Sequence, residues 1–190
     1  MTTGEVEALE RALRRNPVVL AILEGAGDLA LPSWYLGAGG VTQTVWNELH
    51  GFDPTHGIED YDLVYFDPDD LSDHAEQKTA QIATEHFSAL SVKLDVKNEA
   101  RVHLWYAQRF GRSIPAYRSA EHAVGTWPTT ASSIGVRYDD DGFVVCAPFG
   151  LSDLFGMIVR PNKAIVTRTV YEAKAARWAA LWPKLSVVPW

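Results

Sequence analysis

Two aspartates one residue apart, Asp60 and Asp62, lie in the stretch GIEDYDLVYFD. The intervening Tyr61, Leu63 and Tyr65 alternate with them, which predicts a β-strand with one apolar face. Residues i and i+2 of a strand point the same way, with Cα atoms about 6.5–7 Å apart. Two carboxylates at that spacing can hold one hard cation or bracket a pair of metal ions. The same pattern also fits a strand end exposed to solvent, where two aspartates cost little.

A third carboxylate, Asp95, lies in the stretch LSVKLDVK, whose clean alternation predicts another strand. Val92, Leu94 and Val96 would point inward, and the charged residues between them outward. Asp95 could therefore join the first two aspartates across the sheet. Lys97 on the same face is a candidate to meet a phosphate. The alternative is an exposed ladder of opposite charges along one strand.

A glycine-rich turn, GAGG, precedes these acidic strands and ends at Gly40. It lies between a predicted short strand and a predicted helix. Glycines there let backbone N–H groups approach a phosphate at the positive end of the following helix. Gly39 and Gly40 are the candidate phosphate cradle. The spacing matches neither the P-loop nor the dinucleotide fingerprint, and such turns also serve simply as tight corners.

The elements that must position these residues alternate between helices and strands. Asn16 followed by Pro17 predicts a helix start, and Gly51 a helix end. Asp141 and Gly142 predict a hairpin turn. The predicted helices cover residues 5–14, 17–25, 41–50, 72–90, 98–110, 119–124, 152–159 and 167–182, and the predicted strands cover residues 33–37, 61–66, 91–97, 133–139 and 142–147. This order predicts a mixed α/β (α+β) chain whose first half builds a small sheet.

The 190 residues, 47% of them hydrophobic, suit a single domain spanning residues 1–190. Within it we expect N-terminal helices over 1–30, a catalytic sheet core over 31–110, and a hairpin and helical part over 111–190 that completes a cleft. The net charge of −7 is unevenly spread. Residues 48–76 hold ten acidic and no basic side chains, whereas residues 156–190 hold six basic and one acidic. An acidic centre with basic flanks fits a metal site that faces an anion-binding wall. It also fits a surface charge that varies along the chain without a functional role.

Several classes of site and protein are disfavoured. A single cysteine, Cys146, forms no internal disulfide, and the histidines show no metal-ligand spacing. The run Asp139 to Gly142 lacks the later glutamate of a calcium loop. No apolar run is long enough to span a bilayer, and no signal-peptide pattern opens the chain, so we expect a cytoplasmic protein. The tryptophans are expected in the core, with Trp127 followed by Pro128 as a candidate cleft wall.

Together the ordered stretches LGAGGVTQTVWNELHG, IEDYDLVYFD and LDVKNEARVH resemble the nucleotidyltransferase fold of the DNA polymerase beta type. GTWPTTASSIGVRYDDDG, APFGLSDLF and VRPN extend the resemblance to a bacterial nucleotidyltransferase family within that superfamily. It runs from about residue 16 to 185.

The resemblance implies a small mixed sheet flanked by helices, two-metal catalysis with Mg²⁺ (or Mn²⁺), and an NTP donor. By resemblance, Asp60, Asp62 and Asp95 would be the metal ligands and catalytic residues, and pyrophosphate would be released. Further candidate nucleotide-binding residues are Thr42, Lys97, Asn98 and Arg101, with Arg137 a weaker candidate.

The chain departs from the resembled pattern at three places. Gly39-Gly40 stands where the superfamily usually has Gly-Ser, so the hydroxyl that would touch the phosphates either comes from Thr42 or is absent. Glu99 stands where the nearer family is expected to have Gln, and Val102 where it has Met. These changes bear on substrate preference more than on the fold.

Two rivals to a transferase remain. One is a nucleotide-binding or regulatory domain that has lost turnover, which the retained triad of acids disfavours. The other is a toxin–antitoxin component that modifies RNA or protein, which rests on fold analogy. The acceptor is a small molecule, a short RNA or a protein hydroxyl. No basic stripe suits duplex DNA, and no segment suits a membrane.

Overall fold

The computed structural model of the chain describes residues 1–190. At its centre lies a five-stranded sheet in the order β3-β2-β1-β4-β5. β2 and β3 run parallel and the other neighbours run antiparallel. The strands are β1 (Tyr35–Gly37), β2 (Tyr61–Tyr65), β3 (Leu94–Asn98), β4 (Gly135–Asp139) and β5 (Gly142–Cys146). The predicted fold class, a small mixed sheet flanked by helices, is confirmed.

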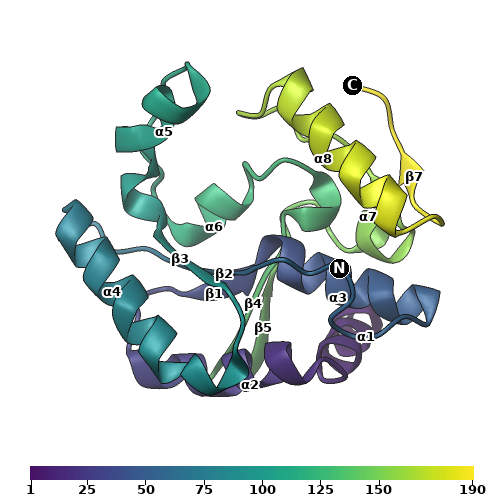
Figure 1. Cartoon of the computed structure of the whole chain (residues 1–190), viewed down its shortest axis with the longest axis horizontal. Helices are drawn as coiled ribbons and strands as arrows, with labels where there is room; N and C mark the ends of the chain where they lie inside the picture. The colour runs from purple at the N-terminus through teal and green to yellow at the C-terminus, as the bar shows by residue number, and fades with distance from the viewer.

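Helices cover both faces of this sheet (Figure 1). α2 and α4 lie on one side, and α5, α6 and α8 are drawn on the other. The helices are α1 (Thr3–Leu13), α2 (Pro17–Gly25), α3 (Ala38–His50), α4 (Asp73–His86), α5 (Val102–Phe110), α6 (Ala120–Val124), α7 (Ser152–Phe155) and α8 (Arg168–Leu181). A parallel pair of short strands, β6 (Ile158–Val159) and β7 (Ser186–Val187), lies apart from the main sheet.

The predicted start of α2 is confirmed in detail. Asn16 is the N-cap and Pro17 the first helical residue, and the Asn16 carboxamide oxygen accepts from the backbone N–H groups of Val18 and Val19. The Asn16 amide nitrogen donates to Thr44 Oγ1 at 2.9 Å. One side chain thus caps α2 and ties it to α3, which places the helix that follows the glycine turn.

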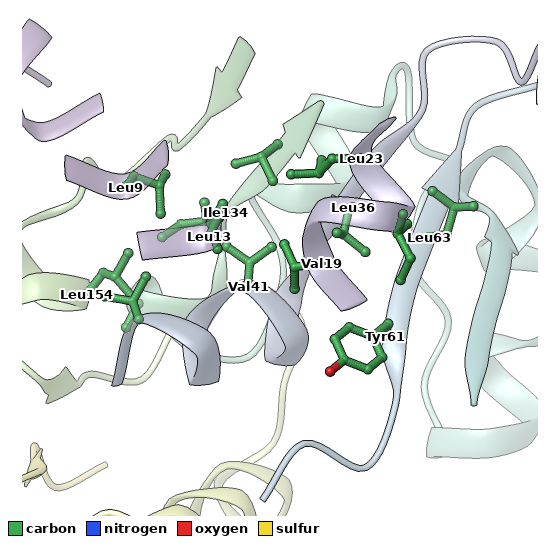
Figure 2. Close-up of a cluster of buried hydrophobic side chains, with 14 of the residues drawn as sticks. Leu9, Leu13, Val19, Leu23, Leu36, Val41, Tyr61, Leu63, Ile134 and Leu154 are labelled. Atoms are coloured by element: carbon green, nitrogen blue, oxygen red, sulfur yellow. The ribbon is translucent and has the colours of Figure 1, made fainter. Parts of the chain in front are cut away.

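The main core lies between the sheet and the N-terminal helices (Figure 2). Leu36 of β1 and Leu63 of β2 are fully buried there with Val19 and Val41 from the helices. A second part of the same core joins α3 to α8 through three buried tryptophans: Trp46, Trp178 and Trp182. Burial of these aromatic rings stabilises the packing of α8 against α3.

The structure corrects three predictions. The hairpin exists, but β4 pairs with β1, with Leu36 opposite Val136, so it extends the main sheet. The first half of the chain therefore does not build the sheet alone. The predicted helix over 152–159 ends at Phe155, because Met157 adopts φ +53° and the β-branched residues after it form β6. Similarly, α4 ends at His86, with a separate 3₁₀ turn over Ser88–Leu90.

Candidate functional site

Sheet register brings the three predicted aspartates to one face. Asp62 of β2 lies opposite Asp95 of β3 on one side and opposite Gly37 of β1 on the other. Asp60 precedes Asp62 by two residues and shares its face. The opposite face carries Leu63 and its neighbours, which are buried in the core. The predicted alternation of both strands is therefore the feature that assembles the acidic cluster.

Asp62 has the most perturbed environment of the three. Burial raises its pKa to about 7, and the charges of Asp60 and Asp95 add to that rise. Lys174 and a hydrogen bond from the Gly39 backbone N–H act in the opposite direction. A carboxylate that is desolvated among like charges favours any cation that can reach it.

The other two aspartates are each paired with a lysine. Asp60 Oδ2 lies 3.0 Å from Lys93 Nζ, and Asp95 Oδ1 lies 3.1 Å from Lys97 Nζ. No group of three or more acidic, histidine or cysteine side chains is close enough in this arrangement to hold a metal ion. The donor set nevertheless fits Mg²⁺ or Mn²⁺ chemically, because carboxylate oxygens are their usual protein ligands. To bind the ion, Asp60 and Asp95 would each have to lose the ion pair with its lysine.

The glycine turn lies beside Asp62. Gly37 ends β1, and α3 begins at the next residue without a side-chain cap. A Cβ at Gly37 would lie 2.6 Å from the Trp127 ring, and one at Gly40 would lie 2.8 Å from the Tyr61 ring. Glycine is therefore required at both positions by close packing, independently of any ligand. Packing brings the uncapped start of α3 against the acidic face.

Thr42, the candidate replacement for the missing serine, is occupied within the fold. Its side chain is buried, and its hydroxyl donates to the carbonyl oxygens of Ala38 at 2.8 Å and Ala131 at 3.1 Å. The first contact lies within α3, and the second connects α3 to the segment before β4. A role for Thr42 in phosphate binding stays a prediction.

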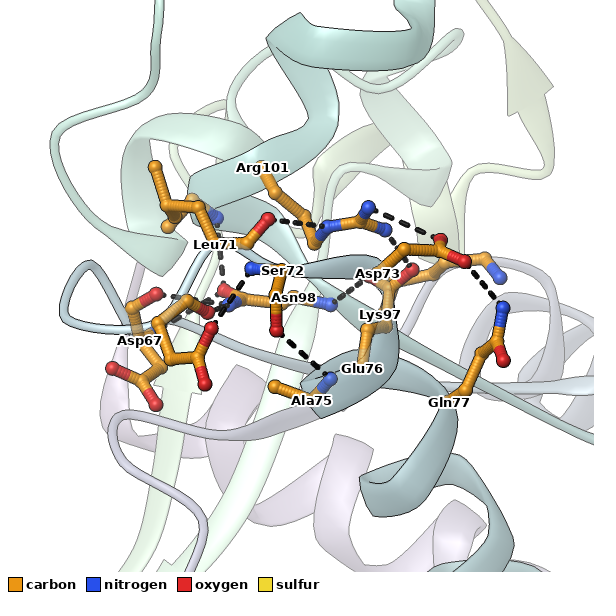
Figure 3. A network of polar contacts seen from close by, with 12 residues as sticks. Asp67, Leu71, Ser72, Asp73, Ala75, Glu76, Gln77, Lys97, Asn98 and Arg101 are labelled. Atoms are coloured by element: carbon orange, nitrogen blue, oxygen red, sulfur yellow. Dashed lines mark hydrogen bonds and ion pairs between the residues drawn. The ribbon is translucent and has the colours of Figure 1, made fainter.

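Asn98 and Arg101, the next candidate nucleotide ligands, are engaged within the fold in this arrangement. Asn98 is the last residue of β3 and exchanges hydrogen bonds with the backbone of Asp67 at 3.0 and 2.8 Å. Arg101 is buried, with its guanidinium 2.6 Å from Glu76 and 3.1 Å from Asp73 (Figure 3). The polar groups of both residues are occupied within a network that joins β3 to α4. Only Lys97, of the three charged or amide candidates on this strand end, lies on the acidic face.

Arg137, the weaker candidate, belongs to β4. Its guanidinium lies 4.7 Å from the centre of the Tyr35 ring and 3.4 Å from Asp139. It is therefore two strands away from β2 and is engaged with the hairpin.

Two charged residues near the cluster were missed by the sequence-based prediction. Lys174 projects from α8, where burial lowers its pKa while the charges of Asp62 and Asp60 raise it. Glu99 is only 6% exposed, and burial, followed by the charge of Asp62, raises its pKa to about 8. The excess of basic residues in the C-terminal segment is the sequence signal that could have indicated Lys174. Glu99 was noted only as a departure from the resembled family.

A cavity of about 480 Å³ adjoins the cluster at the end of β3. Asp95, Lys97 and Glu99 form one wall, α5 forms another, and the segment that leads into α8 closes the third side. Five aromatic side chains line it: Trp105, Tyr106, Phe110, Tyr117 and Trp127. The prediction that Trp127 and Pro128 line a cleft is confirmed, and Trp105, half-buried against a smaller hydrophobic cluster, also forms part of the cavity wall.

Comparison with known proteins defines the class. A family model described as nucleotidyltransferase matches residues 24–187, so the chain belongs to this nucleotidyltransferase family. A solved NMR structure described as revealing a CCA-adding enzyme head domain is similar to it, with 25% identity and a TM-score of 0.79 over 97% of this chain and 96% of that chain. The search of curated proteins gave no match. None of the helices has the length and apolar character needed to cross a membrane.

Proposed function

We propose that this nucleotidyltransferase moves a nucleoside monophosphate from an NTP to an acceptor hydroxyl in a divalent-metal-dependent reaction. The observation that carries the proposal is the cluster of Asp60, Asp62 and Asp95 on one sheet face beside the glycine turn. Membership of the family and similarity to a CCA-adding enzyme head domain support nucleotidyl transfer in general. The carboxylates supply the specific chemistry.

The residues divide into three tasks. Asp60, Asp62 and Asp95 would hold Mg²⁺ (or Mn²⁺), which when bound supplies Lewis-acid stabilisation of the attacking and leaving oxygens. The backbone N–H groups of Gly39 and Gly40 would donate hydrogen bonds to the β- and γ-phosphates at the start of α3. Lys97 and Lys174, released from the aspartates they now face, would neutralise phosphate charge.

The proposed transfer exchanges one P–O bond for another. The acceptor oxygen attacks the α-phosphorus and forms a new P–O bond, while the bond from that phosphorus to the bridging oxygen of pyrophosphate breaks. Asp95 would accept the proton that the hydroxyl loses. Pyrophosphate leaves with the electron pair of the broken bond.

The test is calorimetric titration of the four NTPs, each with Mg²⁺ and with EDTA. We compare the wild type with the double variant Asp60→Asn/Asp62→Asn and with the control Asp139→Asn, an exposed hairpin aspartate. We expect Mg²⁺-dependent binding of a preferred NTP that the double variant loses and the control retains. Binding that ignores both the metal and the double substitution would contradict the proposed site.

A further inference from the structure

The two ends of the acidic face differ in what lies beside them. β1 runs antiparallel to β2, with Gly37 opposite Asp62, so the chain leaving β1 passes the Asp60 end and starts α3 there. The cavity borders Asp95, Lys97 and Glu99, towards the other end of β3. Adjacent strands are about 4.8 Å apart, so the β1 and β3 sides of Asp62 are separated by roughly two strand spacings.

Trp127 lies between the glycine turn and the cavity. A Cβ at Gly37 would lie 2.6 Å from its ring, and the same side chain lines the cavity together with Glu99. The ring thus contacts the end of β1, where the chain enters α3, and forms part of the cavity wall.

Displacement at phosphorus requires the attacking and leaving oxygens to lie roughly in line on opposite sides of the α-phosphorus. If the departing phosphates rest at the start of α3, the attacking hydroxyl must come from the side of Asp95. The cavity is the space on that side. This step rests on the proposed function.

The cavity's charged groups indicate which kind of molecule it takes. Its charged lining residues are Asp95, Lys97, Glu99 and Arg109. Asp95 pairs with Lys97, which the proposed function assigns to the donor's phosphates, and Glu99 is buried beside Trp127. Arg109 has no carboxylate partner, and its guanidinium lies 5.9 Å from the centre of the Trp105 ring. Arg109 is thus the cation left for the acceptor, and one cation beside aromatic walls suits a ring-bearing compound with a single anionic group.

We propose that this cavity is the acceptor site, and that the acceptor is a small hydroxyl compound with an aromatic body and one negative charge facing Arg109. A volume of about 480 Å³ holds a small ligand. The lining offers no row of unpaired cations of the sort that follows a nucleic-acid backbone. Trp105 would stack on the acceptor, and Arg109 would orient it.

Two fluorescent probes test the cavity: hydroxynaphthoate, an aromatic acid with a hydroxyl group, and naphthol, its uncharged counterpart. We compare the wild type with Trp105→Ala and Arg109→Gln. The matched control is Leu104→Ala, on the same helix but 56% exposed and outside the cavity. Each titration is repeated with Mg²⁺ and the preferred NTP present.

We expect Trp105→Ala to weaken both probes about tenfold and Arg109→Gln to weaken only hydroxynaphthoate, about fivefold. Leu104→Ala should change neither, and NTP should not displace the probe. Displacement by NTP, or weaker NTP binding in Trp105→Ala, would show a donor-base site and overturn the assignment. Probe binding that is absent, or that ignores both cavity variants, would overturn it too. Failure of the proposed function is distinguished by loss of Mg²⁺-dependent NTP binding in the wild type itself.

Discussion

Two clusters of charged side chains lie beside β3, and they differ in how far their buried charges are compensated. At its carboxyl end, Arg101 and Glu76 are both about nine-tenths buried and lie 2.6 Å apart, and Glu76 also accepts from the Asn98 backbone N–H at 2.8 Å. On the acidic face, Asp62 is desolvated beside two further carboxylates, and Glu99 nearby has no cation within ion-pair distance. One cluster is internally neutralised, whereas the other retains a surplus of negative charge.

This difference distinguishes a cluster that stabilises the fold from a cluster that can bind a ligand. A neutralised, fully hydrogen-bonded cluster has nothing left to offer a ligand, and removal of one member leaves a buried charge. Desolvation of Asp62 beside two further carboxylates, each paired with a lysine, lowers the stability of the apo protein and favours a bound cation. Substitutions in the two clusters should therefore shift stability in opposite directions.

The largest expected effect is loss of stability on Glu76→Gln. The amide keeps the size of the side chain and its contact with Asn98 but leaves Arg101 buried, with Asp73 at the surface as its only anionic partner. We expect a loss of about 3 kcal/mol in the free energy of unfolding, or a fall in Tm of roughly 6–12 °C. Thermal and urea unfolding measure it. An unchanged Tm would show that the pair contributes nothing.

Asp62→Asn should act in the other direction. The pKa of Asp62 is raised to about 7 from its ordinary value of 3.8, so between these values the native state holds a proton that the unfolded state has lost. Stability from this group is therefore highest below about pH 4 and falls as pH rises towards about 7. The variant should exceed the wild type at pH 7.5 by about 1 kcal/mol or more.

Unfolding curves of the two proteins across the pH range measure that difference. Subtraction of the two curves gives the contribution of Asp62 together with its coupling to Glu99 and Lys174, whose pKa values respond to its charge. A variant less stable than the wild type at neutral pH, or a difference that does not change with pH, would contradict the interpretation of a strained carboxylate.

Glu99→Gln should give the smallest effect. The pKa of Glu99 is raised to about 8 from its ordinary value of 4.5, so between these values the native state holds a proton that the unfolded state has lost, and stability from this group falls as pH rises. We expect a change in the free energy of unfolding below about 0.5 kcal/mol near pH 4, where both states of the wild type are protonated, and a gain of about 1 kcal/mol at pH 9. Calorimetric unfolding at the two pH values measures both. A large loss near pH 4 would indicate that the carboxyl proton itself makes an essential contact.

Local patterns in the sequence predicted much of this arrangement. The alternation around Asp62 and Asp95 reports which side chains share a face, and the pairing of two parallel strands then aligns them. The cap at Asn16 and the end of α3 at Gly51 are equally local signals. Each depends on residues only a few positions apart.

The parts that were missed depend on contacts between residues distant in the chain. The pairing of β1 with β4 joins residues about a hundred positions apart, and Lys174 reaches Asp62 only because α8 packs on α3. Charge type alone could not distinguish Lys97, which lies on the acidic face, from Arg101, which is buried against α4. That difference depends on where β3 ends and where the helix after it begins.

One thermal-shift measurement tests the central contrast directly. We would compare the wild type, Asp62→Asn and Glu76→Gln with and without Mg²⁺ and the preferred NTP. At a ligand concentration of about 100 times Kd, binding adds about 2.7 kcal/mol to the free energy of unfolding. We predict that Glu76→Gln starts at a lower Tm yet keeps the full ligand-induced increase, whereas Asp62→Asn starts higher and loses it. An increase retained in Asp62→Asn would contradict the assignment of the acidic face as the nucleotide site.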